Sequence, residues 1–248
     1  MNQTTRQAVY DLLKNFTQQS FKHYDVEELK RAYPFHRLFF DDAGLIAAKQ
    51  ERSVVTRMGM MLYPKLAQYI AREHFQQVMV EYKIEGILKE RTADTISRIV
   101  RELRAGQRRP DHAAEINEIL NANQGNDQED VRVRVIADLF IGDYNKGPFF
   151  AEIKTIKPNL DIGAETKFKI LMFSVLFAQR NPQAYLAFPY NPYVTRAKYK
   201  HAVTKRILDM QDEVLIGEEF WDAIGGRGTF DQLLGIIDDV GNTVRKEL

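Results

Sequence analysis

Three charged residues near the middle of the chain have the types and the spacing of a hydrolytic metal site. Asp138 lies in the apolar stretch VRVRVIADLFI (131–141), and Glu152 and Lys154 lie two residues apart in FFAEIKTI (149–156). If both stretches are strands, Glu152 and Lys154 share one sheet face while Ile153 points to the other. Charges in such apolar surroundings are unfavourable unless they pair or bind a metal. The pattern therefore indicates a functional site.

The chemistry of these groups fits a magnesium ion that acts on a phosphate. Asp138, Glu152 and the main-chain carbonyl of Ile153 offer hard oxygen ligands, and Mg²⁺ keeps waters and phosphate oxygens in its remaining positions. The ion would stabilise charge on the phosphate and lower the pKa of its water. Lys154 would orient the attacking water or neutralise charge on the scissile phosphate. We therefore expect Mg²⁺-dependent hydrolysis of phosphodiester bonds.

The elements needed to position these residues follow from the same part of the chain. The turn DYNKG (143–147) separates the two apolar stretches, so a β-hairpin is predicted. A well-buried helix over 166–180 and another strand over 184–190 follow. The order strand, strand, helix, strand predicts an α/β fold with a mixed β-sheet flanked by helices.

The N-terminal half has a different pattern. Residues 1–73 have helical spacing, interrupted at Pro34 and at Pro64. Residues 77–89 alternate like a strand between good helix formers, so this segment is left open. Two further helices are expected, over 92–104 and 110–121.

A polar run, NANQGNDQED (121–130), separates the two halves and predicts a loop. We expect a mainly helical N-terminal region, residues 1–125, packed on a second region. That second region, residues 126–248, holds the catalytic core and a C-terminal part that is helical and contacts DNA. The two are expected to form one compact unit.

Composition narrows the class of protein. The 248 residues are 44% hydrophobic, which is enough for a packed core. Cysteine is absent, which fits a reducing compartment, and neither a signal peptide nor a membrane span is recognisable. We therefore expect a cytoplasmic protein with no membrane contact. The net charge is +1, so any DNA contact must use local basic patches.

The acid, the spacer and the Glu152-Ile153-Lys154 triplet resemble the signature of the PD-(D/E)xK nuclease superfamily, with Ala137 in place of the usual proline. A bare motif of this kind is weak, and its place on a predicted hairpin strengthens it. Longer stretches resemble type II restriction endonucleases of the TdeIII kind. They are QERSVVTRMGMMLYPKLA, ADLFIGDYNKGPFFAEIKTIKPN, FPYNPY and DEVLIGEEFWDAIGGRGTFDQLL.

The resemblance implies a restriction-endonuclease-like core and a homodimer that cuts double-stranded DNA at a short palindrome. Enzymes of that group are directed at GGNCC-type sites, which gives a first expectation for the target. A two-fold dimer would match the symmetry of a palindrome and would cut both strands.

Glu51 is a candidate for a fourth catalytic residue. It falls on the helical stripe of Val54, Val55 and Met58, so its carboxylate would share the inward face of that helix. Nucleases of this type often place a helical acid near the metal. An ion pair with Arg52 or another surface cation explains Glu51 equally well.

The segment PYNPYVTRAKYKHAVTKR (189–206) is the most DNA-like surface in the sequence, because it is basic, rich in tyrosine and free of acids. Arginine and asparagine can read base edges and lysine can hold phosphates. The resemblance also implies that the segment after the catalytic strand approaches DNA. The expected DNA contacts are Asn191, Arg196, Lys198, Lys200, Lys205, Arg206, Lys157 and Lys167.

A basic stripe at Arg98, Arg101 and Arg104 could follow a phosphate backbone or form local ion pairs. These two interpretations have equal weight from the sequence. The five histidines show no metal-ligand spacing, so a zinc site is not expected.

Three alternatives to a restriction enzyme stay open. A junction resolvase or a repair nickase has the same core and recognises the shape of DNA. A DNA-binding protein without activity can retain this fold, although its catalytic triad would be damaged. The triad here, Asp138, Glu152 and Lys154, is intact. Asp138, Glu152 and Lys154 could also be a structural ion-pair cluster in an unrelated enzyme.

Overall fold

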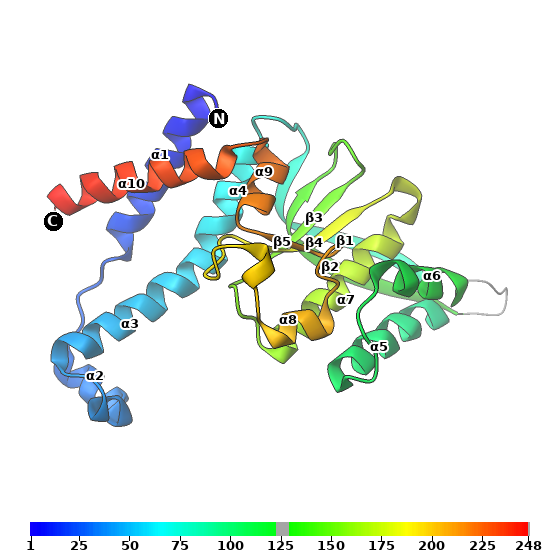
Figure 1. Ribbon diagram of the computed structural model, residues 1–248, viewed down its shortest axis with the longest axis horizontal. Coiled ribbons are helices and arrows are strands. Elements are labelled where there is room, and N and C mark those ends of the chain that lie inside the picture. Colours follow the sequence, from blue (N-terminus) through cyan, green and yellow to red (C-terminus); the bar gives the residue numbers. More distant parts are fainter. Residues whose placement is uncertain (123–128, 248) are drawn as a thin grey trace.

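A mixed five-stranded sheet forms the centre of the protein (Figure 1). The computed structural model describes residues 1–122 and 129–247, so the predicted loop at 121–130 falls largely outside the described residues. Spatial order follows chain order, with antiparallel pairing among the first three strands and parallel pairing among the last three. The strands are β1 (Val78–Lys89), β2 (Asp130–Ile141), β3 (Phe149–Ile153), β4 (Gln183–Phe188) and β5 (Val214–Ile216).

The expected α/β class and mixed sheet are confirmed, as is the hairpin, which is β2 and β3. The undecided segment 77–89 is a strand, β1, and it pairs with β2 along almost its whole length. The mainly helical N-terminal region therefore contributes a strand to the sheet.

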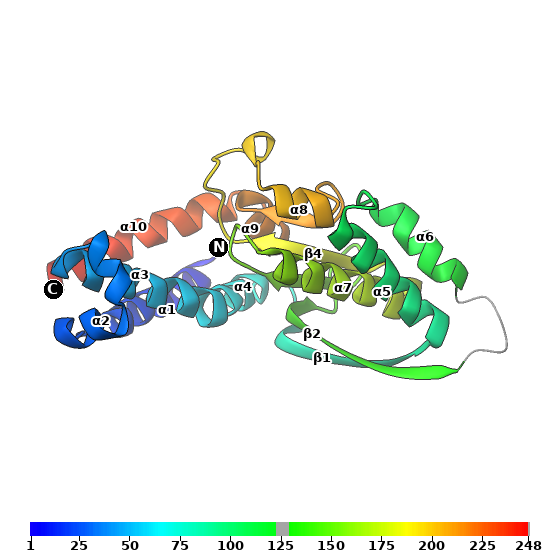
Figure 2. The ribbon, with the colours of Figure 1, turned by 90° about the horizontal axis from the view of Figure 1, so that it is seen from below.

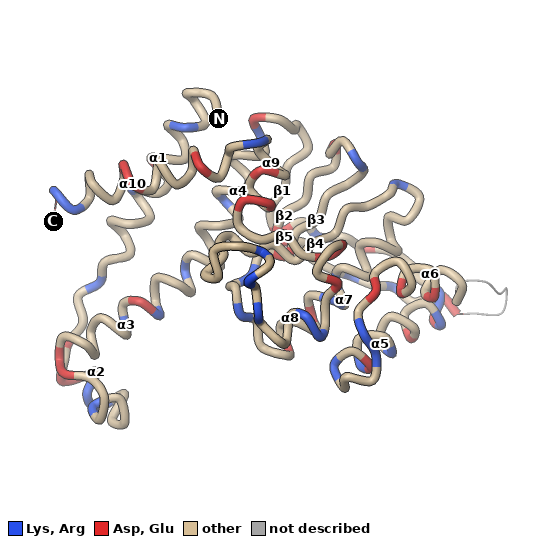
Figure 3. Tube along the Cα trace, in the orientation of Figure 1, with Lys and Arg blue, Asp and Glu red and all other residues tan. Residues whose placement is uncertain are grey.

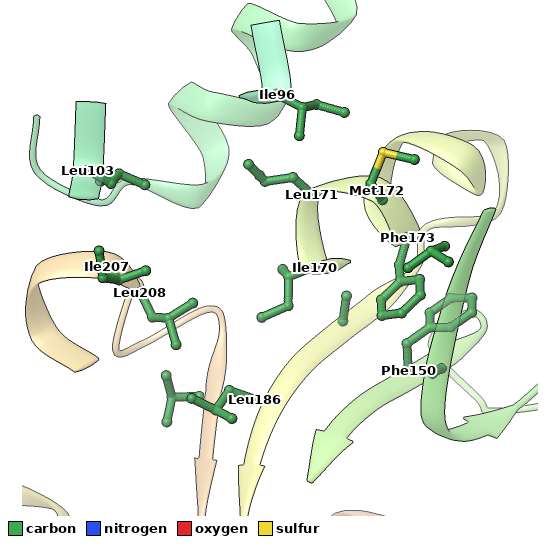
Figure 4. Close-up of a cluster of buried hydrophobic side chains, with 14 of the residues drawn as sticks. Ile96, Leu103, Phe150, Ile170, Leu171, Met172, Phe173, Leu186, Ile207 and Leu208 are labelled. Carbon is green, nitrogen blue, oxygen red and sulfur yellow. The ribbon is translucent and has the colours of Figure 1, made fainter. Parts of the chain in front are cut away.

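Helix α7 (Leu160–Leu176) covers one face of the sheet and is buried on most of its circumference. The Asn159 side chain caps it by accepting a hydrogen bond from the backbone N–H of Ile162 at 2.8 Å. A short 3₁₀ turn, η3 (Ala178–Arg180), follows it. Figure 4 shows Phe150 of β3 and Leu186 of β4 beneath the side chains of α7. Around α7 lie α5 (Glu90–Ala105), α6 (His112–Ala122) and α8 (Ala202–Ile207).

The opposite face carries a second core, built on Leu139, Phe149 and Ile153. Trp221 is buried in this core and donates its indole N–H to the carbonyl of Pro189 at 2.8 Å. The helices of this face are α1 (Gln3–Ser20), α4 (Tyr63–Ala71), α9 (Glu218–Gly225) and α10 (Thr229–Glu247).

Residues 21–57 form an arm that extends away from the sheet (Figures 1 and 2). Its elements are α2 (Val26–Ala32), the 3₁₀ turn η1 (Pro34–Leu38) and α3 (Asp42–Arg57). A π-helical segment, η2 (Met58–Leu62), then joins α3 to α4. The arm thus ends beside the sheet at a distorted helical turn, the kind of turn often found at functional sites. No helix in the described part of the chain is long and apolar enough to cross a membrane.

A buried ion cluster ties α6 and α7 to the loop before β5. The Lys167 ammonium of α7 contacts the carboxylates of Glu115 and Glu213, and all three side chains have no exposed surface. His112 Nδ1 lies 2.8 Å from Glu213 Oε1. Each acid is compensated by the same lysine, so the cluster depends on that one residue.

Lys167→Met should therefore lower the free energy of unfolding by about 3–5 kcal/mol, because it leaves two buried carboxylates without a cation. Urea unfolding at neutral pH measures the change. Lys157→Met, which alters an exposed lysine, should stay within about 0.5 kcal/mol of the wild type. Equal stability of the two variants would show that the cluster does not hold these elements together.

Candidate active site

The structure brings Asp138, Glu152 and Lys154 together at one end of the β2–β3 pair. Lys154 Nζ lies 2.7 Å from Asp138 Oδ2 and 3.0 Å from Glu152 Oε2. Asp138 Oδ2 also accepts the backbone N–H of Ile153 at 2.8 Å, at the position where the β2–β3 ladder ends. The Asp138 carboxylate therefore takes the place of the next backbone hydrogen bond of the β2–β3 ladder. It also fixes the start of the loop that carries Lys154.

Glu152 is fully buried, and a second lysine stabilises its charge. Lys169 Nζ, one of the side chains of α7, donates to Glu152 Oε2 at 2.9 Å. Burial raises the pKa of Glu152 and the nearby Asp138 raises it further, although Lys154 and Lys169 oppose the rise. Burial alone would lower the pKa of Lys154, but the carboxylates of Glu152 and Asp138 outweigh it and raise that pKa. Lys154 therefore carries an ammonium at neutral pH.

The backbone changes direction at Asp138. In β2, Ala137 packs in the core under α7, whereas Leu139 packs in the core on the other face. A regular strand would send both to the same face, because they are two residues apart. Asp138 therefore lies where the alternation of β2 inverts, and its side chain is partly exposed at this bend.

A cleft of about 540 Å³ opens beside these residues. The end of α3 and the π-helical segment η2 that follows the arm form the far wall of this cleft. Its lining residues are Val55, Thr56, Gly59, Met60, Pro64, Glu81, Asp138, Ile153, Lys154 and Thr155.

Glu51 does not line this cleft. It is exposed and lies on α3 one turn before Val55, on the same side of the helix but farther from Asp138. The helical periodicity placed it on the correct side of α3 but could not give its distance along the helix. We therefore leave Glu51 out of the site. An acid that the sequence did not single out, Glu81 of β1, lines the cleft in its place.

The unsatisfied oxygens of the two acids fit a cation. Glu152 Oε1 is buried without a hydrogen-bond partner. Asp138 Oδ2 accepts two hydrogen bonds, and none reaches Oδ1 from residues 1–122 or 129–247. Each carboxylate thus keeps one oxygen for a ligand, and oxygen donors of this kind suit Mg²⁺. Ile153 has a buried side chain and lines the cleft, so its main chain is what faces the site.

A second group of possible metal ligands, His112, Glu115 and Glu213, lies in the ion cluster under α7. The Lys167 ammonium already contacts both carboxylates there. A cation of the protein itself therefore fills the position that a metal would need. This cluster is structural, and the candidate metal site is the one at Asp138.

Three of the expected DNA contacts have structural partners instead. Lys167 is fully buried, so the interpretation of this lysine as a DNA contact is corrected. Arg196 binds the Glu219 carboxylate and the carbonyls of Met210 and Val214, the last at 3.1 Å. Arg206 donates to the carbonyls of Leu103, at 3.2 Å, and Arg104 at the end of α5. We do not propose base or phosphate contacts for these three residues.

The remaining expected contacts are accessible. Lys157, Lys198, Lys200 and Lys205 are exposed and have no acidic partner among the described residues. Asn191 is partly exposed and accepts the N–H of Tyr193 at 2.9 Å. Lys198 belongs to the 3₁₀ turn η4 (Arg196–Lys198). Figure 3 shows the basic positions gathered along the segment that leads into α8.

Two of the three arginines of the α5 stripe, Arg98 and Arg104, form ion pairs, whereas Arg101 is exposed. Arg98 lies 2.8 Å from Glu102 and also contacts Glu118 of α6. Arg104 contacts Asp161 at the start of α7. This supports the interpretation of the stripe as local ion pairs.

Lys169 was not singled out from the sequence, although it contacts the carboxylate of Glu152. Lys167 and Lys169 lie two residues apart at the start of a predicted buried helix, so both are equally plausible as buried cations. Only the positions of Glu152 and Glu213 around α7 distinguish them. No signal in the sequence alone gives these positions.

Comparison with known proteins points to one group of enzymes. The sequence model of the family described as "Type II restriction endonuclease, HinfI" matches residues 1–241. Type II restriction enzyme HgiBI of Herpetosiphon aurantiacus is 26% identical over 262 residues, covering 97% of this chain and 94% of that enzyme. HgiCII of the same organism is 27% identical, covering 100% and 97%. MjaII of Methanocaldococcus jannaschii is 25% identical, covering 89% and 66%. No solved structure matches significantly.

The basic residues divide into arginines with structural partners and accessible lysines, and variants of the two groups should have different effects. Arg196→Lys should lower the free energy of unfolding by about 1–3 kcal/mol, because an ammonium cannot replace the guanidinium contacts. Lys198→Ala with Lys200→Ala should leave stability unchanged but weaken DNA binding and lower the slope of log affinity against log salt by about two. Urea unfolding and fluorescence anisotropy measure both effects. A salt slope unchanged by the double substitution would remove these lysines from the DNA interface.

Proposed function

The chain belongs to the HinfI family of type II restriction endonucleases and is a site-specific deoxyribonuclease, and we propose that Asp138, Glu152 and Lys154 form its Mg²⁺-dependent centre. The observation that carries the proposal is the convergence of two carboxylates and an ammonium at one sheet end, beside a cleft. The resemblance of the sequence motif to that of the PD-(D/E)xK nucleases supports the same assignment.

Each residue has a distinct part in the proposed mechanism. Asp138 and Glu152 would hold the ion through their unpaired oxygens, and the main-chain carbonyl of Ile153 would be a third donor. When bound, Mg²⁺ supplies positive charge against the phosphate and lowers the pKa of its water.

Lys154 stabilises negative charge on the phosphate or orients the attacking water, since its ammonium lies between the two acids. Lys169 positions the Glu152 carboxylate from α7, and it leaves Oε1 of that carboxylate free. The substrate is double-stranded DNA at a short palindromic site, for which a GGNCC-like sequence is the first candidate.

Cleavage of unmethylated plasmid tests the proposed centre. Asp138→Asn and Lys154→Ala should each lower the cleavage rate on the order of 10²- to 10⁴-fold, because each removes a group that stabilises the transition state. Chelation of the divalent ion should stop the wild type. Glu85→Gln, which alters an exposed acid on the same sheet, should cut normally. Full activity of Asp138→Asn would disprove the assignment.

Sequencing of the ends produced by the wild type would give the target and the cut position. Defined fragments with a common palindrome at their ends support restriction-type cleavage. Nicks that follow DNA shape rather than sequence would contradict the proposed palindromic target.

We also propose that the protein acts as a homodimer joined through the tip of the arm. Phe35, Leu38 and Phe39 are 78%, 76% and 81% exposed, and Phe40 follows them at 44%. A large aromatic side chain buries about 150–250 Å², so this tip offers roughly 500 Å² of apolar surface. A dimer would bury both tips and the partner surfaces that the tips cover. This total area approaches that of a stable interface, roughly 1,600 Å². A second copy is the expected partner, because a palindrome requires two symmetric active sites.

Phe35→Ser combined with Phe39→Ser should convert the dimer to a monomer, because it removes most of the apolar surface of the tip. Sedimentation equilibrium measures the change. Ile87→Ser, which alters an exposed apolar residue of β1 outside the arm, should remain dimeric. A wild type that stays monomeric at every concentration would contradict the proposed dimer, and a dimeric double variant would contradict its interface.

A further inference from the structure

Glu81 of β1 has a backbone conformation that is unusual for its residue type. Its φ angle is 49°, in the left-handed region, where a side chain other than that of glycine is disfavoured. It lies inside a long strand, and the neighbouring β1–β2 pairs are Val80 with Leu139 and Tyr82 with Ala137. In this register, Glu81 lies opposite Asp138, between those two pairs. The strained residue therefore lies directly across from the proposed metal ligand.

The strain inverts the alternation of β1. Val80 packs with the core built on Leu139, whereas Tyr82 packs with the core under α7. The same inversion occurs in β2 at Asp138, so the two strands bend together. As a result Glu81 and Asp138 both line the cleft at the bend.

Nothing in the described part of the chain compensates the charge of Glu81. Its side chain is exposed and receives no ion pair or side-chain hydrogen bond from the described residues. Glycine would adopt the same backbone without the steric cost, so a glutamate there gives the fold no visible benefit. Strain of this kind is commonly kept at functional sites.

The charge balance of the site shows what Glu81 could supply. Asp138 and Glu152 carry two negative charges, and Lys154 and Lys169 carry two positive charges, so these four residues sum to zero. A divalent ion binds more tightly as the number of charged oxygen ligands rises. A third carboxylate at the cleft would make the site net negative.

We propose that Glu81 is the third carboxylate of the divalent-cation site, binding the ion opposite Asp138 either directly or through one of its waters. This inference rests on the proposed function, since it requires the ion to bind at Asp138 and Glu152. Glu81 of β1 thus has the role of an additional acid near the metal, which the sequence suggested for Glu51 of α3.

Titration of Ca²⁺ into the full-length protein in the presence of duplex DNA, with calorimetry to measure the binding affinity, tests the proposal. Glu81→Gln keeps the shape of the side chain and should weaken Ca²⁺ binding about tenfold or more. Glu85→Gln is the matched control, because Glu85 is exposed on the same strand without the unusual φ angle. It should bind Ca²⁺ like the wild type.

Thermal unfolding without metal gives a readout independent of activity. Glu81→Gly relieves the strained backbone and should raise Tm by about 2–4 °C, while it weakens Ca²⁺ binding like Glu81→Gln. Glu85→Gly should lower Tm, because glycine weakens a regular strand. A gain in stability together with a loss of metal binding is the expected signature.

Two results would overturn the inference alone. In one, the wild type binds Ca²⁺ and Glu81→Gln binds it as tightly. In the other, Glu81→Gly lowers the metal-free Tm, so that the side chain stabilises the fold. A wild type that binds no divalent ion, with or without DNA, would instead overturn the proposed metal centre itself.

Discussion

The buried carboxylate of Glu152 is the constraint around which the site is organised. An ionised group with no exposed surface is costly unless cations or hydrogen bonds compensate it. Lys154 follows it on the same chain segment, and Lys169 reaches it from α7, so the sheet and its covering helix both contribute. The position of α7 on the sheet therefore affects the geometry of the site as well as the stability of the core.

Two clusters in this protein contain a buried acid and a lysine, and they differ in what is left unsatisfied. In the cluster at Lys167, all three side chains are sealed from solvent, and the one carboxylate oxygen without a hydrogen bond, Glu115 Oε2, contacts the Lys167 ammonium. At Glu152, one carboxylate oxygen stays without a partner and the neighbouring Asp138 lines an open cleft. The first cluster can only hold elements together, whereas the second has room and ligands for an ion and a phosphate.

The sequence was sufficient for the fold class, for the hairpin and for the proximity of Asp138, Glu152 and Lys154, because alternation and the acid-spacer pattern are local signals. It was not sufficient for β1. Val78, Val80, Tyr82 and Ile84 alternate regularly in the sequence, yet the first two and the last two pack on opposite faces. The bend at Glu81 lies opposite the bend at Asp138 of β2, a partner distant in the sequence, so no local pattern marks it. For the same reason the cleft-lining acid, Glu81, was missed and Glu51 was selected instead.

The use of basic residues explains how a chain with a net charge of +1 can still engage DNA. Arg196 and Arg206 donate hydrogen bonds to main-chain carbonyls, so the accessible lysines of the segment before α8 are the proposed phosphate contacts. Helix α3 carries the apolar tip at one end and cleft residues at the other, over 16 residues or about 24 Å. A helix of this length therefore sets the distance from the proposed dimer contact to each proposed active site.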